Sequence, residues 1–446
     1  MDNLREWLEH RKTDDKSVLS FFIKGYLFLS LLCFILLILP ISNTGGIELV
    51  DHIFYSISIV STTGLAPGNF GADYTLFGHI VSLFFIQLGG IGYMALSSFL
   101  VLRHFSKLPT LSVRLLKLEL NLPTKYPLRS FIISVFAFTF LLELLGTILL
   151  YIGFVRVGVD QPLWFAIFHS ISAFCTAGFS LSADSMVAFR SDWLISTTIM
   201  VLSLLGSIGF IVLFDFWLRI TQKRKTISQT AVIILVTTFG VWMLGSLLIF
   251  FSDLELLKQG WSGLYYATFQ SISSHTTVGF NNYDISKISV GGLFIMIIIM
   301  IIGASPAGTG GGIKTTSIGA LIAVLVSVLR RKKHITLLKK EIPKTNIFLA
   351  ISSITFYVLI LCVGVWIITL NDGGTLPFIG ILFECSSALS TVGLSTGLTG
   401  EFSDLGKIII SLLMFIGRLG VLTFGLALIS QEPKSVYKPK IEEIAI

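Results

Sequence analysis

Charged residues are scarce in this chain: they make up 13% of its 446 residues, whereas 54% are hydrophobic. A soluble globular domain carries about 25% charged residues, so this composition argues against a water-soluble enzyme. The apolar residues fall in at least eight long blocks, such as 21–40 and 134–154. A helix needs ~20 apolar residues to cross a bilayer. The sequence therefore predicts an all-α polytopic membrane protein.

Cysteine and histidine are also few, with four and seven residues. The cysteines lie in or beside apolar blocks without disulfide or metal spacing, which favours small buried hydrophobes. The histidines are scattered, and the intramembrane acids Glu143 and Glu384 stand alone in the sequence. No bound cofactor, metal centre or catalytic constellation is predicted, and the protein is not expected to be an enzyme.

The net charge is +7, and the basic residues that produce it are not spread evenly along the chain. Most Lys and Arg fall in five segments between apolar blocks: 1–19, 103–129, 218–228, 329–345 and 431–446. Short basic loops stay cytoplasmic, and the first apolar block has no cleavage site. We therefore expect a multi-pass plasma-membrane protein with both termini cytoplasmic. We also expect these basic residues to contact anionic lipid headgroups. No nucleic-acid partner is expected.

A thirteen-residue motif occurs four times. Each copy has Phe at position 2, Ser at 6, Thr at 10 and Gly at 12, and the glycines are 114, 101 and 114 residues apart. The copies are IFYSISIVSTTGL (53–65), IFHSISAFCTAGF (167–179), TFQSISSHTTVGF (268–280) and LFECSSALSTVGL (382–394). Such self-similarity indicates a repeat architecture.

Each motif lies between two long apolar blocks, on a stretch too short to span a bilayer. A basic segment follows each unit, so every unit returns to the side where it began. We predict four parallel M1–pore-helix–M2 repeats around a pseudo-four-fold central pore, with eight transmembrane helices and four re-entrant pore helices. The boundaries are an N-terminal segment 1–19, repeats 20–103, 129–220, 228–330 and 345–430, and a tail 431–446.

The end of each motif is then non-helical backbone at membrane depth, which must be buried in protein or line a watery cavity. Four such segments can surround a dehydrated monovalent cation with carbonyl oxygens. Glycine permits the unusual dihedrals that this needs; simple helix capping is the alternative interpretation. The predicted ion-binding residues are Thr62, Thr63, Gly64, Thr176, Ala177, Gly178, Thr277, Val278, Gly279, Thr391, Val392 and Gly393.

The second apolar blocks share a small-residue element that begins at Gly89, Gly206, Gly303 and Gly417. Tight helix packing explains the glycines. The next residue is small in three repeats but is Arg418 in the fourth. An arginine inside an apolar span usually faces a partner or a water-filled path. We expect Arg418 to project into the conduction path below the ring and to limit cation flux.

The third repeat contains GASPAGTGGGIKTTS at 303–317, which cannot hold a helix. Ile313 stands where a phosphate-binding loop requires glycine, so nucleotide binding is rejected. A mobile gate inside the membrane is the preferred hypothesis, and a structural turn is the alternative. The predicted gate residues, together with Arg418, are Gly303, Ser305, Pro306, Gly308, Gly310, Gly311, Gly312 and Lys314.

These motifs resemble the Trk/Ktr/HKT superfamily of potassium transporters, and the chain is most similar to KtrB-like membrane subunits of bacterial Ktr uptake systems. The resemblance covers about residues 20–430 and rests on the four Thr-x-Gly segments, the 303–317 loop and Phe415–Gly420. It implies a K+-selective filter at the four glycines, a gate at 303–317 and a constriction arginine at Arg418. It also implies a homodimer and a cytoplasmic nucleotide-binding KtrA-like ring; Na+ dependence stays open.

The leading functional hypothesis is therefore K+ uptake through a gated, carbonyl-lined filter. The alternative is a secondary transporter of a small organic solute or of another monovalent cation. A midplane solute site would favour inverted repeats with one or two broken helices, whereas four copies in one orientation are inferred here.

Overall fold

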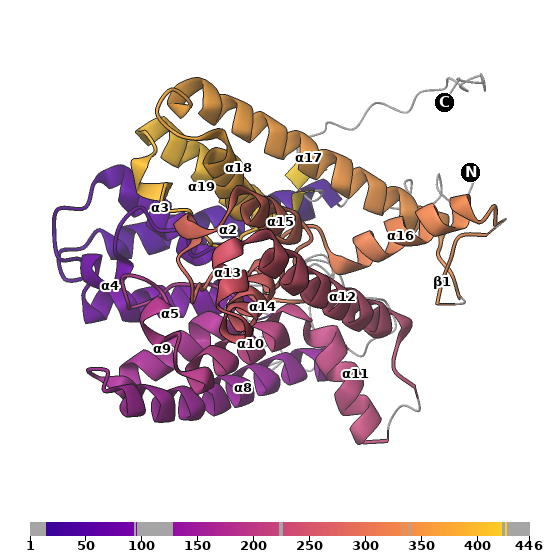
Figure 1. The fold of residues 1–446 in the computed structure, drawn as a ribbon, viewed down its shortest axis with the longest axis horizontal. Helices are drawn as coiled ribbons and strands as arrows, with labels where there is room; N and C mark the ends of the chain where they lie inside the picture. Colours follow the sequence, from indigo (N-terminus) through magenta and orange to yellow (C-terminus); the bar gives the residue numbers. More distant parts are fainter. Residues whose placement is uncertain are drawn as a thin grey trace.

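The computed structural model describes residues 15–92, 95, 128–222, 226–332, 334–338, 340–421 and 424–425. Most of the predicted N-terminal segment 1–19, nearly all of the basic segment 103–129 and the whole tail 431–446 lie outside these ranges. The described part is mostly helical, with one two-stranded hairpin (Figure 1). This agrees with the predicted all-α class.

The helices follow one order four times: a long helix, a short helix that carries the motif, and a closing helix. The long helices are α2 (Asp15–Leu37), α8 (Leu128–Val157), α12 (Gln229–Ser252) and α17 (Lys344–Asp372). The short helices are α3 (Leu49–Val60), α9 (Pro162–Phe174), α14 (Trp261–Thr276) and α18 (Phe378–Leu389). The closing helices are α5 (Leu76–Ile91), α10 (Trp193–Ser207), α15 (Val290–Ile301) and α19 (Asp404–Leu419).

Shorter elements join these helices. Two of them, α11 (Phe210–Ile220) and α16 (Thr315–Leu329), continue a closing helix after a break. The other elements are α4 (Phe70–Asp73), α13 (Leu254–Lys258), η1 (Val187–Phe189), η2 (Ile285–Lys287), η3 (Thr399–Glu401), β1 (Thr336–Leu337) and β2 (Lys340–Glu341).

A polar side chain starts every closing helix. The four residues accept hydrogen bonds from backbone N–H groups of the first turn, which have no partner inside the helix. They are Thr75, Asp192, Ser289 and Ser403. These four residues therefore set where each closing helix begins.

Three described helices, α8, α12 and α17, are long and apolar enough to cross a membrane. The pair α10 and α11 also passes this test together, although it bends by 90°. The other described apolar helical stretches, which include Ile23–Leu37 within α2, have 10–17 residues, so the predicted total of eight spans stays a prediction. Large apolar side chains on the long helices face outward, as lipid contact requires; examples are Leu144, Phe251 and Trp366.

The closing block is interrupted in all four units, whereas the sequence predicts a break only in the third. Helix α5 ends before Gly92, α10 ends just before Gly209, and α19 ends before Gly420. These three glycines have φ of 92°, 86° and 83°, which an α-helix cannot contain. Each of them is the last glycine of the small-residue element, three residues after Gly89, Gly206 or Gly417, and its positive φ ends the helix.

Helix contacts link the four units into a closed cycle. Each long helix packs on the short helix of its own unit, and each closing helix packs on the short helix of the next unit: α5 on α9, α10 on α14, α15 on α18, and α19 on α3. The last contact joins the C-terminal unit to the N-terminal one, whose ribbons lie side by side in Figure 1. The described parts of the basic segments 218–228 and 329–345 both lie on the right side of that view.

Candidate functional site

The four Thr-x-Gly segments meet at one place and form a closed ring. A Cβ added to any of the four glycines would lie 3.0–3.2 Å from the Cα atom of the next glycine in the order 64, 178, 279, 393 and back to 64. It would also collide with a carbonyl oxygen of that neighbour. The four carbonyls, in the same order of glycines, belong to Ala177, Val278, Val392 and Thr63. Main chain therefore packs on main chain around the ring, and only glycine fits there.

The ring has the same backbone conformation in each segment. The threonine at position 10 of the motif has φ between 50° and 59°, and the glycine at position 12 has φ between 65° and 92°. Positive φ in a β-branched residue is an outlier that the surrounding structure must hold in place. The threonines are Thr62, Thr176, Thr277 and Thr391. The sequence predicted unusual dihedrals at the glycines, but nothing in it indicated them at the threonines.

The serine at position 6 of the motif holds each segment. Its backbone oxygen accepts a hydrogen bond of 2.8–3.2 Å from the residue between threonine and glycine. In three segments its hydroxyl donates to the carbonyl of the residue after the glycine, and in the first and fourth the glycine N–H donates to that hydroxyl. The residues are Ser58, Ser172, Ser273 and Ser387. The sequence alone indicates no role for this serine, although its presence in all four copies is a signal that it matters.

The small-residue element lets the closing helices approach the ring. A Cβ on Gly89, Gly206 or Gly417 would collide with the carbonyl oxygen of the last residue of a short helix. Those residues end α3, α9 and α18. The predicted tight packing at these three glycines is therefore confirmed. In the third unit, His275 contacts the carbonyl of Ile302 at 2.9 Å instead.

The unwound loop of the third unit runs from 302 to 314, between α15 and α16, close to the predicted 303–317. It reaches three ring threonines. The Thr309 and Thr176 hydroxyls are 3.0 Å apart, and the Gly311 N–H donates to the Thr277 hydroxyl at 3.2 Å. A Cβ on Gly311 would also collide with the Thr391 hydroxyl.

Further hydrogen bonds fix this loop against its surroundings. The Ser305 N–H donates to the Ser207 carbonyl at 3.0 Å, and the Phe210 N–H donates to the Ala307 carbonyl at 2.9 Å. The Lys314 ammonium donates to the Gly310 carbonyl at 2.8 Å. Added Cβ atoms at the other predicted glycines of the loop (Gly303, Gly308, Gly310 and Gly312) would all meet neighbouring atoms, and the Pro306 carbonyl lies against Gly209.

Arg418 contacts the remaining ring threonine. Its guanidinium donates to the Thr62 hydroxyl at 3.0 Å and to the carbonyls of Thr309 and Gly89. The side chain thus joins the ring, the loop and α5. Sequence reasoning placed Arg418 near the ring but missed Thr309, because no local pattern distinguishes that threonine from others in the loop.

The two acids that stand alone in the sequence have partners in the structure. Glu384 accepts hydrogen bonds from Ser395, Thr396 and Thr399 in the loop after the fourth segment. Glu143 accepts one from Gln87. Among the residues that the structure describes, no cluster of three or more His, Cys, Asp or Glu side chains could hold a metal ion.

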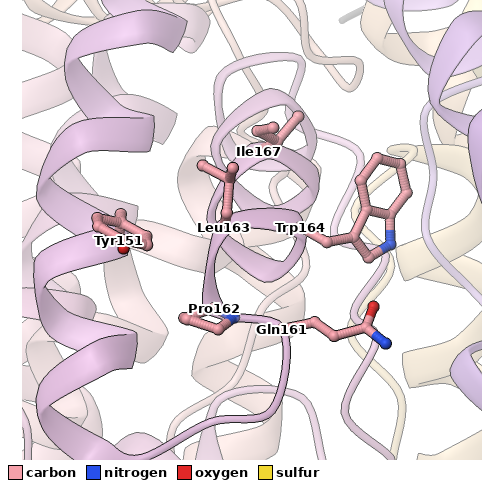
Figure 2. A pocket seen from close by; sticks show the side chains of 6 residues that line it. All are labelled: Tyr151, Gln161, Pro162, Leu163, Trp164 and Ile167. Atoms are coloured by element: carbon pink, nitrogen blue, oxygen red, sulfur yellow. The ribbon is translucent and has the colours of Figure 1, made fainter.

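A cavity of about 410 Å³ lies apart from the ring. Figure 2 shows it between Tyr151 on α8 and the start of α9, lined by Gln161, Pro162, Leu163, Trp164 and Ile167. The ring residues of this unit follow the other end of α9. The cavity therefore takes no part in the site.

The sequence model of the TrkH family, which is described as a cation transport protein, matches residues 133–438 of this chain. The chain belongs to the TrkH family of cation transport proteins. It is 32% identical to the Ktr system potassium uptake protein B of Vibrio alginolyticus, over 91% of this chain and 90% of that protein. It is 30% identical to the potassium/sodium uptake protein NtpJ of Enterococcus hirae, over 95% of each.

A crystal structure of the potassium transporter TrkH from Vibrio parahaemolyticus has the same fold, with a TM-score of 0.69 at 19% identity. The match covers 91% of this chain and 85% of that one. Membership in the TrkH family confirms the predicted resemblance. It also confirms that the chain is a multi-pass membrane transporter rather than an enzyme.

Proposed function

We propose that this chain takes up K+ across the cytoplasmic membrane through the ring of four Thr-x-Gly segments. The supporting observation is the closed ring, in which each glycine packs against main chain of the next segment. Carbonyl oxygens held in this way replace the hydration shell of a monovalent cation. The names of the Ktr relatives, which are potassium uptake proteins, support K+ as the ion.

The repeat assignment belongs to the same proposal: four M1–pore-helix–M2 units surround an axis along the membrane normal. The cyclic packing of closing helices on short helices supports it. Transport then needs no chemical energy source. A membrane potential of about 100 mV contributes ~2.3 kcal/mol per cation, which corresponds to roughly 50-fold accumulation.

In this proposal the loop 302–314 and Arg418 form the gate. Together they contact all four ring threonines on one side of the glycines. A cation leaving the ring on that side would meet the loop and a fixed positive charge, so the described conformation is the closed one. Opening requires the loop to leave the threonine hydroxyls.

Partners are proposed on the names of the relatives. A Ktr system contains more than its membrane protein, so we propose a cytoplasmic nucleotide-binding subunit of the KtrA kind as the regulator. We also propose a homodimer and keep Na+ coupling open, since one relative is named a potassium/sodium uptake protein.

The deciding experiment is Rb+ and Na+ uptake in cells that lack their own K+ uptake systems, comparing the parent with Gly64→Ser. Gly64 has φ +91° and touches Ala177, whereas Gly45 has the same φ of +91° with nothing within 4 Å. Gly45→Ser is therefore the matched control for backbone strain. We expect Gly64→Ser to lose the preference for K+ over Na+ and Gly45→Ser to keep it.

Equal preference in Gly64→Ser and the parent would contradict the ring as the selective element. Uptake of Na+ but not of Rb+ by the parent would favour the alternative, a transporter of another monovalent cation.

A further inference from the structure

A buried polar group contacts Cys175, the residue that precedes Thr176 in the second Thr-x-Gly segment. Glu143, near the middle of α8, is only 5% exposed. The Gln87 amide on α5 donates to its carboxyl at 2.9 Å. The Cys175 sulfur lies 3.7 Å from that carboxyl and 3.6 Å from the Gln87 amide oxygen. Three elements from two units therefore meet at one polar contact.

Cys175 is confined on its other side as well. A Cβ added to Gly90 would be 2.7 Å from the cysteine sulfur, so the side chain lies between α5 and the Glu143 carboxyl of α8. Cys175 immediately precedes Thr176, whose hydroxyl donates to the Cys175 carbonyl at 2.8 Å. A shift of Cys175 is therefore passed to the strained threonine and to the ring.

The residues that correspond to Cys175 in the other units have different hydrogen-bond partners. They are Ser61, Thr276 and Ser390. Ser390 forms a 2.6 Å hydrogen bond to the Tyr357 hydroxyl on the long helix α17. Ser61 pairs with Thr63, and Thr276 donates to its own helix. Long helices thus hold this position in the second and fourth units, but only the second uses a carboxyl group.

A carboxyl group in an apolar span costs free energy and usually has a function. We propose that Glu143 and Gln87 are positioning residues that set ion selectivity by holding Cys175 and the second segment in register with the ring. This inference rests on the proposed function, in which the ring selects K+. Gly64 abuts the carbonyl of Ala177, and Gly178 abuts that of Val278. A displaced second segment therefore alters the carbonyl positions on both of its sides.

The test uses the full-length chain in the same uptake assay, with four variants: Glu143→Leu, Gln87→Leu, the double variant and Glu143→Gln. Thr147→Val is the control, since Thr147 lies one turn further on α8 and, among the described residues, its hydroxyl bonds to the Glu143 backbone carbonyl and not to the carboxyl. The readouts are the ratio of Rb+ to Na+ uptake and the separate KM and maximal rate for Rb+, each normalised to membrane abundance.

We expect each Leu variant to lose the preference for K+ by about tenfold, the effect of roughly one unsatisfied buried hydrogen-bonding group. The double variant should lose no more than either single one, because both changes break the same contact. Glu143→Gln should stay close to the parent, since an amide keeps a hydrogen bond to Gln87. Thr147→Val should match the parent.

Parental selectivity in both Leu variants would overturn the inference, and so would a loss in Glu143→Gln as large as that in Glu143→Leu. If Glu143→Leu fails to reach the membrane, Gln87→Leu and Cys175→Ala decide in its place by the same criterion. A changed preference in Gly64→Ser beside unchanged Glu143 and Gln87 variants would leave the proposed function standing and refute this inference alone.

Discussion

Replacing Arg418 with alanine tests the gate at its most connected side chain. The guanidinium donates to the Thr62 hydroxyl at 3.0 Å and also to the Thr309 and Gly89 carbonyls. Thr309 belongs to the loop, whereas Thr62 and Gly89 do not. The Thr309 contact is therefore the one that must break when the loop moves away.

A hydrogen bond from a charged donor contributes about 1.5–3 kcal/mol. If the Thr309 contact stabilises only the closed conformation, its loss shifts the open-to-closed ratio by roughly 10- to 100-fold. Removing the positive charge also lowers the electrostatic barrier for a cation leaving the ring. Both effects act in the same direction, so Arg418→Ala should increase basal flux by at least about tenfold.

The assay is Rb+ influx into proteoliposomes that contain the purified chain without a regulatory subunit, normalised to protein content. Arg418→Lys is the matched control, because lysine keeps the charge but cannot reach three acceptors with one planar group. An intermediate flux in Arg418→Lys would show that charge and contacts both contribute. Flux in Arg418→Ala at or below that of the parent would refute the reasoning.

Three further predictions concern the loop 302–314, the serine at position 6 of the motif, and Asp192. Removing three residues from within 305–312 should raise basal Rb+ flux in the same liposomes; unchanged flux would favour the structural-turn interpretation. Ser273→Ala removes a 2.5 Å hydrogen bond to the Phe280 carbonyl and should destabilise the protein by about 1 kcal/mol, seen as a lower Tm in detergent. Ser134 is the control, because its hydroxyl forms an exposed hydrogen bond to the Ser130 carbonyl within α8. Ser134→Ala should leave Tm unchanged, and equal Tm values for the two variants would contradict a stabilising role of Ser273. Asp192, at the start of α10, is the pH-sensitive case. Burial raises its pKa, but hydrogen bonds from Arg156 and from the backbone of Ile195 and Leu194 outweigh this, so the pKa is below its ordinary value. The carboxylate therefore stabilises the fold above its unfolded pKa, and this contribution is lost as pH falls through the folded value. Asp192→Asn should lower Tm at pH ~7 and converge with the parent toward pH ~3; a difference that is constant with pH would contradict this reasoning.

Much of the site could be predicted because the chain repeats itself. Four glycines in register predicted four unusual turns, and the turns are present with positive φ at every copy. The glycine-rich composition of 303–317 predicted a broken helix, and the break runs from 302 to 314. These predictions succeeded because glycine content and helix length are local properties that any tertiary context must respect.

Other features could not be predicted, because they depend on contacts between distant segments. Thr309 contacts Thr176 across 133 residues, and Arg418 contacts Thr62 across 356. Glu143 stood alone in the sequence, yet Gln87 lies beside it in the structure. The breaks at Gly92, Gly209 and Gly420 were also missed, since one glycine in an apolar block fits a continuous packed helix equally well.

The sequence by itself determined that the protein is a bundle of membrane helices, that four equivalent segments leave helical geometry, and that the third unit carries an unwound loop. Composition and periodicity are sufficient for this, because a bilayer accepts only satisfied backbone. Only the tertiary structure decided that the four segments meet in one ring, that the loop and Arg418 lie against its threonines, and that Glu143 and Gln87 contact Cys175 beside one segment. Those arrangements depend on which helix packs on which, and hydrophobic patterning alone does not encode that choice.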